Sequence, residues 1–167
     1  MPIPADARPV NEGSRFSATS PVQALLKADS PEGELARTWV RFAKGLIAED
    51  GVQLEEVTAP ELRCFELEDS GFPPGLAGLK AFRAAINGAM PDEWAVIMKL
   101  EADVSNSTVE TELLAGGTHT GELMGIPATG RTVEFTLRTL GKFDGDRLVR
   151  RWDRTDFADL MRQLGAA

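Results

Sequence analysis

The spacing of apolar residues changes at Pro91, and this change constrains the fold most strongly. Before it, apolar side chains recur three and four residues apart, as on one face of a helix. After it, apolar and polar side chains alternate, as on strands that bury one face. Helices followed by a run of long strands indicate an α+β fold, in which the helices cover one face of a mostly antiparallel sheet.

Two main helices are predicted ahead of this change. Ser30 can cap the first, and Pro31 suits its first position. Gly51 is predicted to end that helix, and the second spans residues 76–88. A last short helix is expected after the strands, with Asp156 as its cap.

Four long strands and one short strand are predicted. The long ones cover residues 94–103, 109–115, 133–140 and 148–154, and the short one covers 62–67. Turns are expected at Asn106-Ser107 and around Gly145, which suits a positive φ. In the last strand, simple alternation places Arg151 and Asp153 on one face and Trp152 on the other.

Residues 1–30 are predicted to be a Pro/Ser-rich extension without regular structure. Prolines at positions 2, 4, 9 and 21 remove amide donors and fix φ. A short apolar patch of Val22, Leu25 and Leu26 could dock on the domain or on a partner subunit. Residues 31–167 are then predicted to form a single domain, which the length of 167 residues suits.

The counts of three residue types narrow the possible chemistry. The chain has one cysteine, Cys64, one histidine, His119, and no tyrosine. It therefore cannot form an intrachain disulfide or a zinc cage of histidines and cysteines. We expect no metal site and no cofactor. Catalysis would fall to carboxylates, arginines, hydroxyls, backbone amides or the single imidazole.

Charge and hydropathy exclude several classes of partner. The net charge of -8 disfavours binding to nucleic acid and to anionic membranes. No apolar run approaches the roughly 20 residues of a membrane span. The N-terminus lacks the basic start and apolar stretch of a signal peptide, so we expect a cytoplasmic protein.

Two places in the sequence could carry chemistry. Residues 117–131 form a Gly-rich segment that contains His119 but matches neither a phosphate loop nor a dinucleotide fingerprint. Asp153 lies near the end of the last strand, where a carboxylate facing a concave sheet is a candidate general base. The alternative for Asp153 is a structural ion pair with Arg138 or Arg151.

Three stretches together resemble the SnoaL-like polyketide cyclase (ester cyclase) family of the nuclear transport factor 2-like fold. They are GLAGLKAFRAAINGAMPD at 75–92, GTHTGELMGIPATGRTVEF at 117–135 and KFDGDRLVRRWDRTD at 142–156. The similarity covers roughly residues 35–164. It implies a cone, in which a curved, mixed and mostly antiparallel sheet wraps around N-terminal helices and leaves a deep apolar pocket. It also implies a homodimer.

The resemblance further implies cofactor-independent cyclisation of an apolar, polyketide-like carbonyl compound by an aldol-type reaction, or related lyase or isomerase chemistry. Asp153 matches the acidic general base, and His119 is the second catalytic candidate. Many members carry a histidine in the short strand before the Pro-Gly turn, where this chain has none. The candidates for substrate binding are Trp152, Thr139, Phe135, Leu137, Arg63 and Cys64.

Other functions of the same fold stay open. A non-catalytic protein that binds a small ligand, or an accessory subunit, would need no general base. The steroid isomerases and dehydratases of this fold rely on tyrosines, which this chain lacks. Epoxide hydrolysis relies on an Asp-Arg-Asp arrangement, which Asp153 with an arginine could imitate.

Overall fold

The computed structural model describes residues 5–9 and 15–166. Within them, the helices are α1 (Ser20–Lys27), α2 (Pro31–Ile47), α3 (Gly51–Val57), the 3-10 turn η1 (Phe65–Leu67), α4 (Gly75–Ala89) and α5 (Phe157–Gln163). The strands are β1 (Arg8–Pro9), β2 (Phe16–Ala18), β3 (Thr58–Cys64), β4 (Trp94–Asp103), β5 (Thr108–Thr118), β6 (Thr132–Asp144) and β7 (Arg147–Thr155).

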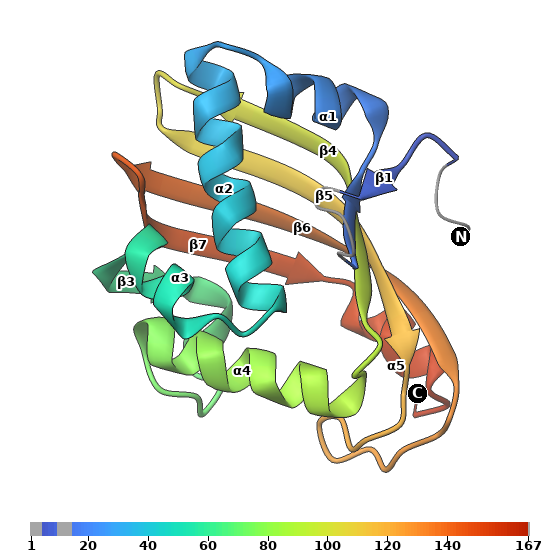
Figure 1. The fold of residues 1–167 in the computed structure, drawn as a ribbon. Coiled ribbons are helices and arrows are strands. Elements are labelled where there is room, and N and C mark those ends of the chain that lie inside the picture. The colour runs from blue at the N-terminus through green and yellow to red at the C-terminus, as the bar shows by residue number, and fades with distance from the viewer. Residues whose placement is uncertain (1–4, 10–14, 167) are drawn as a thin grey trace.

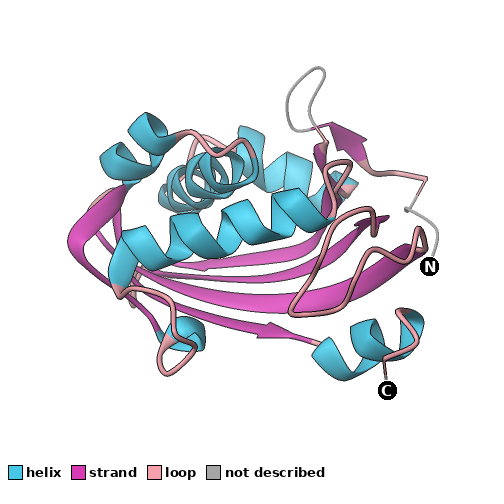
Figure 2. Cartoon of the chain, turned by 90° about the horizontal axis from the view of Figure 1, so that it is seen from below, coloured by secondary structure: helices cyan, strands magenta, loops and turns pink. Residues whose placement is uncertain are grey.

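The strands form one mixed sheet in the order β1-β2-β4-β5-β6-β7-β3. The pairs β2–β4 and β3–β7 are parallel and the other pairs are antiparallel. Helices α2 and α4 lie across one face of the curved sheet, and α5 follows at the end of β7 (Figure 1). Figure 2 shows the same layering from below. The predicted α+β cone with a mostly antiparallel sheet is therefore confirmed.

Side-chain caps mark the first residues of α2, α3 and α5. Ser30 accepts a hydrogen bond from the backbone N–H of Gly33, and Asp156 accepts one from Asp159, so both predicted caps are confirmed. The prediction that the first main helix runs to Gly51 is wrong. Asp50 caps a new helix there by accepting from the backbone N–H of Gln53 at 3.1 Å, and α2 has already ended at Ile47.

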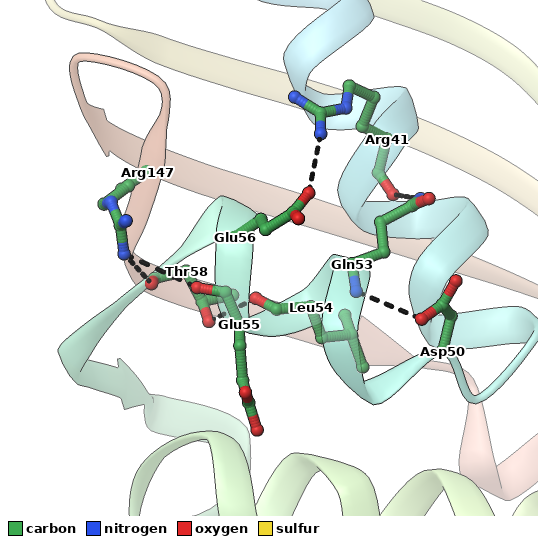
Figure 3. Close-up of polar contacts among 8 residues, drawn as sticks. All are labelled: Arg41, Asp50, Gln53, Leu54, Glu55, Glu56, Thr58 and Arg147. Carbon is green, nitrogen blue, oxygen red and sulfur yellow. Dashed lines mark hydrogen bonds and ion pairs between the residues drawn. The ribbon is translucent and has the colours of Figure 1, made fainter.

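The short strand begins earlier than predicted, because polar contacts stop α3 at Val57 (Figure 3). The hydroxyl of Thr58 donates to the carbonyl of Leu54 at 2.6 Å. Arg147 on β7 donates to the carbonyl of Thr58 at 3.2 Å and so joins the two strands where they start. The strand therefore covers residues 58–64, and residues 65–67 form a 3-10 turn instead.

One extra residue in β7 changes which side chains face the helices. Phe143 pairs with Leu148, but Lys142 pairs with Arg150, so Val149 has no partner of its own on β6. Such a β-bulge reverses the side-chain alternation along its strand. Leu148 and Arg151 are consequently both buried although they are three residues apart.

The expectation that residues 1–30 lack regular structure is wrong for 16–27. Strand β2 adds to the sheet beside β4, and Phe16 is 1% exposed. Val22 on α1 is buried, and Leu25 and Leu26 pack against the core, so the apolar patch docks on the same chain. Parts of the predicted extension, residues 1–4 and 10–14, lie outside the described residues.

The burial of Phe16 predicts a large loss of stability for Phe16→Ala. Removal of a fully buried phenyl ring costs about 3–5 kcal/mol in free energy of unfolding, measurable by urea denaturation. Val52→Ala, at a side chain 71% exposed, serves as control and should cost less than about 0.5 kcal/mol. A similar small loss for both variants would contradict the packing of this segment in the core.

Candidate functional site

A largely apolar cavity lies between the helices and the sheet. Its empty space is about 860 Å³, part of which opens to solvent. Aromatic and aliphatic side chains from α2, α4 and the strands form most of its wall. Six polar or charged side chains also line it, and they are Arg83, Glu93, Thr139, Arg151, Asp153 and Thr155.

Asp153 is held at the cavity wall by hydrogen bonds to both carboxylate oxygens. Arg151 donates from Nη2 to Oδ2 at 2.8 Å, and the hydroxyl of Thr155 donates to Oδ1 at 3.1 Å. Its side chain is 12% exposed. Position 153 pairs with Thr139 on β6, which also faces the cavity. The sheet thus presents one fixed carboxylate to an apolar space.

Arg151 is buried between two carboxylates. Its Nη1 donates to Oε1 of Glu66, while Nη2 donates to Asp153. The guanidinium carbon lies 5.8 Å from the ring centroid of Phe42 on α2. Burial acts to lower the pKa of Arg151, but Asp153 and then Glu66 outweigh it and raise that pKa. The guanidinium therefore stays charged.

Burial changes the pKa of the Glu66 carboxyl. Burial raises its pKa, and the positive charge of Arg151 offsets only part of that effect. Its Oε2 is buried and accepts no hydrogen bond within the described residues. Glu66 itself does not line the cavity. It acts on the site through Arg151, for which it competes with Asp153.

Three of the predicted substrate-binding residues line the cavity. Phe135 and Leu137 contribute apolar surface from β6. Thr139 lies next to them, and its hydroxyl is 2.5 Å from the hydroxyl of Thr111 on β5. The structure brings these three side chains together with Asp153, as expected for residues alternating on neighbouring strands.

The other three predicted substrate-binding residues do not line the cavity. Trp152 lies on the opposite face of the sheet, 37% exposed, and stacks on Phe65 with ring centroids 4.7 Å apart. Arg63 is exposed and pairs with Glu68. Cys64 is buried in the core, outside the cavity lining. The three side chains therefore lie outside this cavity, and their role in substrate binding stays a prediction.

His119 also lies apart from Asp153, because it holds the base of the Gly-rich loop. Its backbone N–H donates to the carbonyl of Arg131, and its carbonyl accepts from Gly130, both at 2.8 Å. The backbone N–H of Thr129 donates to Nδ1 at 3.3 Å, and the hydroxyl of Thr129 lies 2.9 Å from the same nitrogen. The side chain is fully buried and does not line the cavity. The two predicted catalytic residues are thus not brought together.

Sequence reasoning missed Glu66, Arg83 and Glu93. Glu66 is the last residue of the stretch, residues 62–66, where the family resemblance pointed to a missing histidine, so an acidic residue there was a usable signal. Arg83 falls four residues after Leu79 on the apolar stripe of α4, which is an unusual position for a charge. Nothing in the sequence pointed to Glu93, because only the turn after α4 brings it to its partner Arg83.

Two features, a metal-binding cluster and a membrane-spanning helix, are absent from the described part of the chain. Within residues 5–9 and 15–166, no three His, Cys, Asp or Glu side chains are grouped so that they could hold a metal ion. No helix in these ranges is long and apolar enough to cross a membrane.

The raised pKa of Glu66 predicts a pH-dependent effect of Glu66→Gln. The protonated form stabilises the fold fully below the ordinary pKa of 4.5, and this stabilisation is lost as the pH rises through the raised value. The free energy of unfolding of Glu66→Gln relative to the parent should therefore increase with pH across that window in urea titrations. Glu61→Gln, at an exposed site on β3, controls for the lost charge. A difference that stays constant or falls with pH would contradict the argument.

Burial predicts that Cys64 is unreactive. Desolvation raises the pKa of its thiol to about 12, with Arg151 opposing the shift. The thiolate fraction is then roughly a thousandfold below that of a thiol at the ordinary pKa of 9.0. We expect no labelling by a thiol-specific disulfide reagent at pH near 8 within minutes, and complete labelling in denaturant. Rapid labelling of the native protein would show that Cys64 is accessible.

Comparison with known proteins adds to this geometry. The family model for SnoaL-like polyketide cyclases matches residues 38–164. No curated protein matches the chain.

Three solved structures share the fold. TsrD from Streptomyces laurentii has a TM-score of 0.70 at 21% identity and covers 84% of this chain and 100% of its own. AclR from Streptomyces galilaeus, described as a candidate hydroxylase, has a TM-score of 0.69 at 20% identity and covers 81% and 98%. IdmH from Streptomyces antibioticus, described as a candidate polyketide cyclase, has a TM-score of 0.66 at 26% identity and covers 79% and 99%. The match to the family model spans most of the chain, which therefore belongs to the SnoaL-like polyketide cyclase family.

Proposed function

We propose that this protein catalyses cofactor-independent cyclisation of an apolar, polyketide-like carbonyl compound, with Asp153 as the general base. The observation that carries the proposal is the position of Asp153. It is a carboxylate fixed by two hydrogen bonds at the wall of an apolar cavity. Membership of the SnoaL-like polyketide cyclase family supports the same reaction class.

The reaction uses Asp153 twice. The carboxylate removes a proton from a carbon flanked by carbonyl groups and leaves an enolate on the substrate. The enolate carbon attacks a second carbonyl of the same molecule, which forms a carbon–carbon bond and an alkoxide. The alkoxide then takes a proton back from Asp153, so the product is an isomer of the substrate. The apolar wall excludes water and strengthens the hydrogen bonds that stabilise the enolate.

The geometry around Asp153 suits a base that must return its proton. Arg151 binds only one of its oxygens, and that arginine is shared with Glu66. Thr155 binds the other oxygen and can rotate its hydroxyl away. Asp153 is thus oriented without being enclosed in a bidentate ion pair. Thr139, its neighbour across the strands, offers a hydroxyl to a substrate oxygen.

A second candidate function is the binding of a small apolar ligand without catalysis. It is favoured by one observation, that both oxygens of Asp153 already accept hydrogen bonds from the protein. The acid-arginine-acid arrangement of Glu66, Arg151 and Asp153 is also reminiscent of epoxide hydrolysis on this fold. Glu66 does not line the cavity, however, so of these two carboxylates an epoxide would meet only Asp153.

Carbon-bound hydrogen exchange tests the base without knowledge of the natural substrate. The probe is 2-tetralone, an apolar bicyclic ketone whose acidic carbon-bound hydrogens exchange in D₂O and are counted by mass spectrometry. The parent should accelerate this exchange, and Asp153→Asn should slow it by about 10²–10⁴-fold, since the amide cannot accept the proton.

Asp146→Asn is the matched control for this experiment. The side chain at 146 is exposed in the β6–β7 turn, so its loss should leave the exchange rate unchanged. Exchange by Asp153→Asn at the parental rate would refute the general-base role. A parent that binds the ketone but does not accelerate exchange would favour the non-catalytic function.

A further inference from the structure

A second buried ion pair lines the cavity, away from Asp153. Arg83 on α4 donates from Nη2 to Oε2 of Glu93 and, at 2.8 Å, to Oδ1 of Asn87. Both side chains of the ion pair are 9% exposed. Neither of them touches the cluster formed by Glu66, Arg151 and Asp153 in any contact of the described residues.

The helix explains why an arginine is found there. Positions 79, 83 and 86 share one face of α4, and all three line the cavity. After α4, the backbone N–H of Glu93 donates to the carbonyl of Met90, and this turn returns Glu93 towards the helix. Asn87, one turn after Arg83, donates in turn to Glu49 at 2.5 Å. Two side chains, Glu93 and Asn87, therefore fix the guanidinium of Arg83 at the wall, and Glu49 in turn holds Asn87.

Part of the hydrogen-bonding capacity of Arg83 is unused. Its hydrogen bonds with the described residues all come from Nη2. Nε is buried and has no partner among the described residues. A buried ion pair is weak evidence for stability, because apolar residues of similar volume often stabilise a fold as well or better. A wall needed only for packing would be expected to be apolar here, as its neighbours Leu79 and Ile86 are.

We propose that Arg83 is a substrate-binding residue, which donates a hydrogen bond to a carbonyl oxygen of the ligand. The ligand then has an apolar body with one reactive carbonyl region near Asp153 and a further acceptor oxygen at the α4 wall. The assignment of Arg83 extends the proposed function. It rests on the proposed function only in taking the cavity as the ligand site. Glu93 and Asn87 are positioning residues, which hold Arg83 through its Nη2.

Equilibrium dialysis with two isosteric probes tests the assignment. The probes are 2-acetylnaphthalene, which carries a carbonyl oxygen, and 2-isopropenylnaphthalene, in which a CH₂ group replaces that oxygen. The parent should bind the ketone at least about tenfold more tightly than the hydrocarbon, because only the ketone accepts a charge-assisted hydrogen bond. The double variant Arg83→Met/Glu93→Gln leaves no unpaired buried charge. It should still bind the hydrocarbon, and it should bind the two probes about equally tightly.

Thr155→Val is the matched control, since it removes a cavity-lining donor that binds Asp153 and has no contact with Arg83 among the described residues. It should keep the preference for the ketone. The proposal is overturned if the double variant keeps the preference, if Thr155→Val loses it, or if the parent shows none, including the case in which neither probe binds. Asp153→Asn should still prefer the ketone, so failure of the general-base role and failure of the Arg83 assignment are separately visible.

Discussion

The site depends on one extra residue, Val149, in the last strand. Without it, strict alternation from the buried Leu148 would turn Arg150 and Trp152 towards the helices. The bulge reverses the faces, so that Arg151 and Asp153 point inwards and Trp152 points outwards. The apolar cavity therefore has charged side chains in its wall. The chemistry of the site depends on how the buried charge of Arg151 is balanced.

The buried charge of Arg151 is balanced by two carboxylates that differ in their surroundings. Glu66 is covered by the chain and its pKa is raised by burial, whereas Asp153 faces the cavity and is bound by Thr155 as well. Their side chains are almost equally exposed, at 13% and 12%, so the difference lies in access to the cavity. Glu66, which does not line the cavity, balances and positions Arg151. The carboxyl at the wall is left to meet a ligand. Arg83 and Glu93 repeat this arrangement on the helical side, so the cavity has polar contacts on two of its walls.

Most of the fold could be predicted from the sequence, because the local signals for helices and strands agree with the arrangement of helices on the sheet. The change of period at Pro91 and the caps at Ser30 and Asp156 are properties of neighbouring residues. The strand β2 and helix α1 could not be foreseen in the same way. Their three and eight residues are stabilised by pairing with β4 and by burial against α2, not by their own propensity.

The candidate site was only partly predictable for the same reason. Family resemblance pointed to Asp153, and alternation grouped Phe135, Leu137 and Thr139 correctly. Glu66 and Arg83 reach the site from distant segments, and a single sequence does not record such contacts. The measurement that tests the central claim most directly is a crystal structure with 2-naphthol, an aromatic analogue of an enol. We predict that its rings occupy the cavity with the carboxylate of Asp153 in contact with them. Binding on the outer face beside Trp152, or in the cavity without contact to Asp153, would contradict the account.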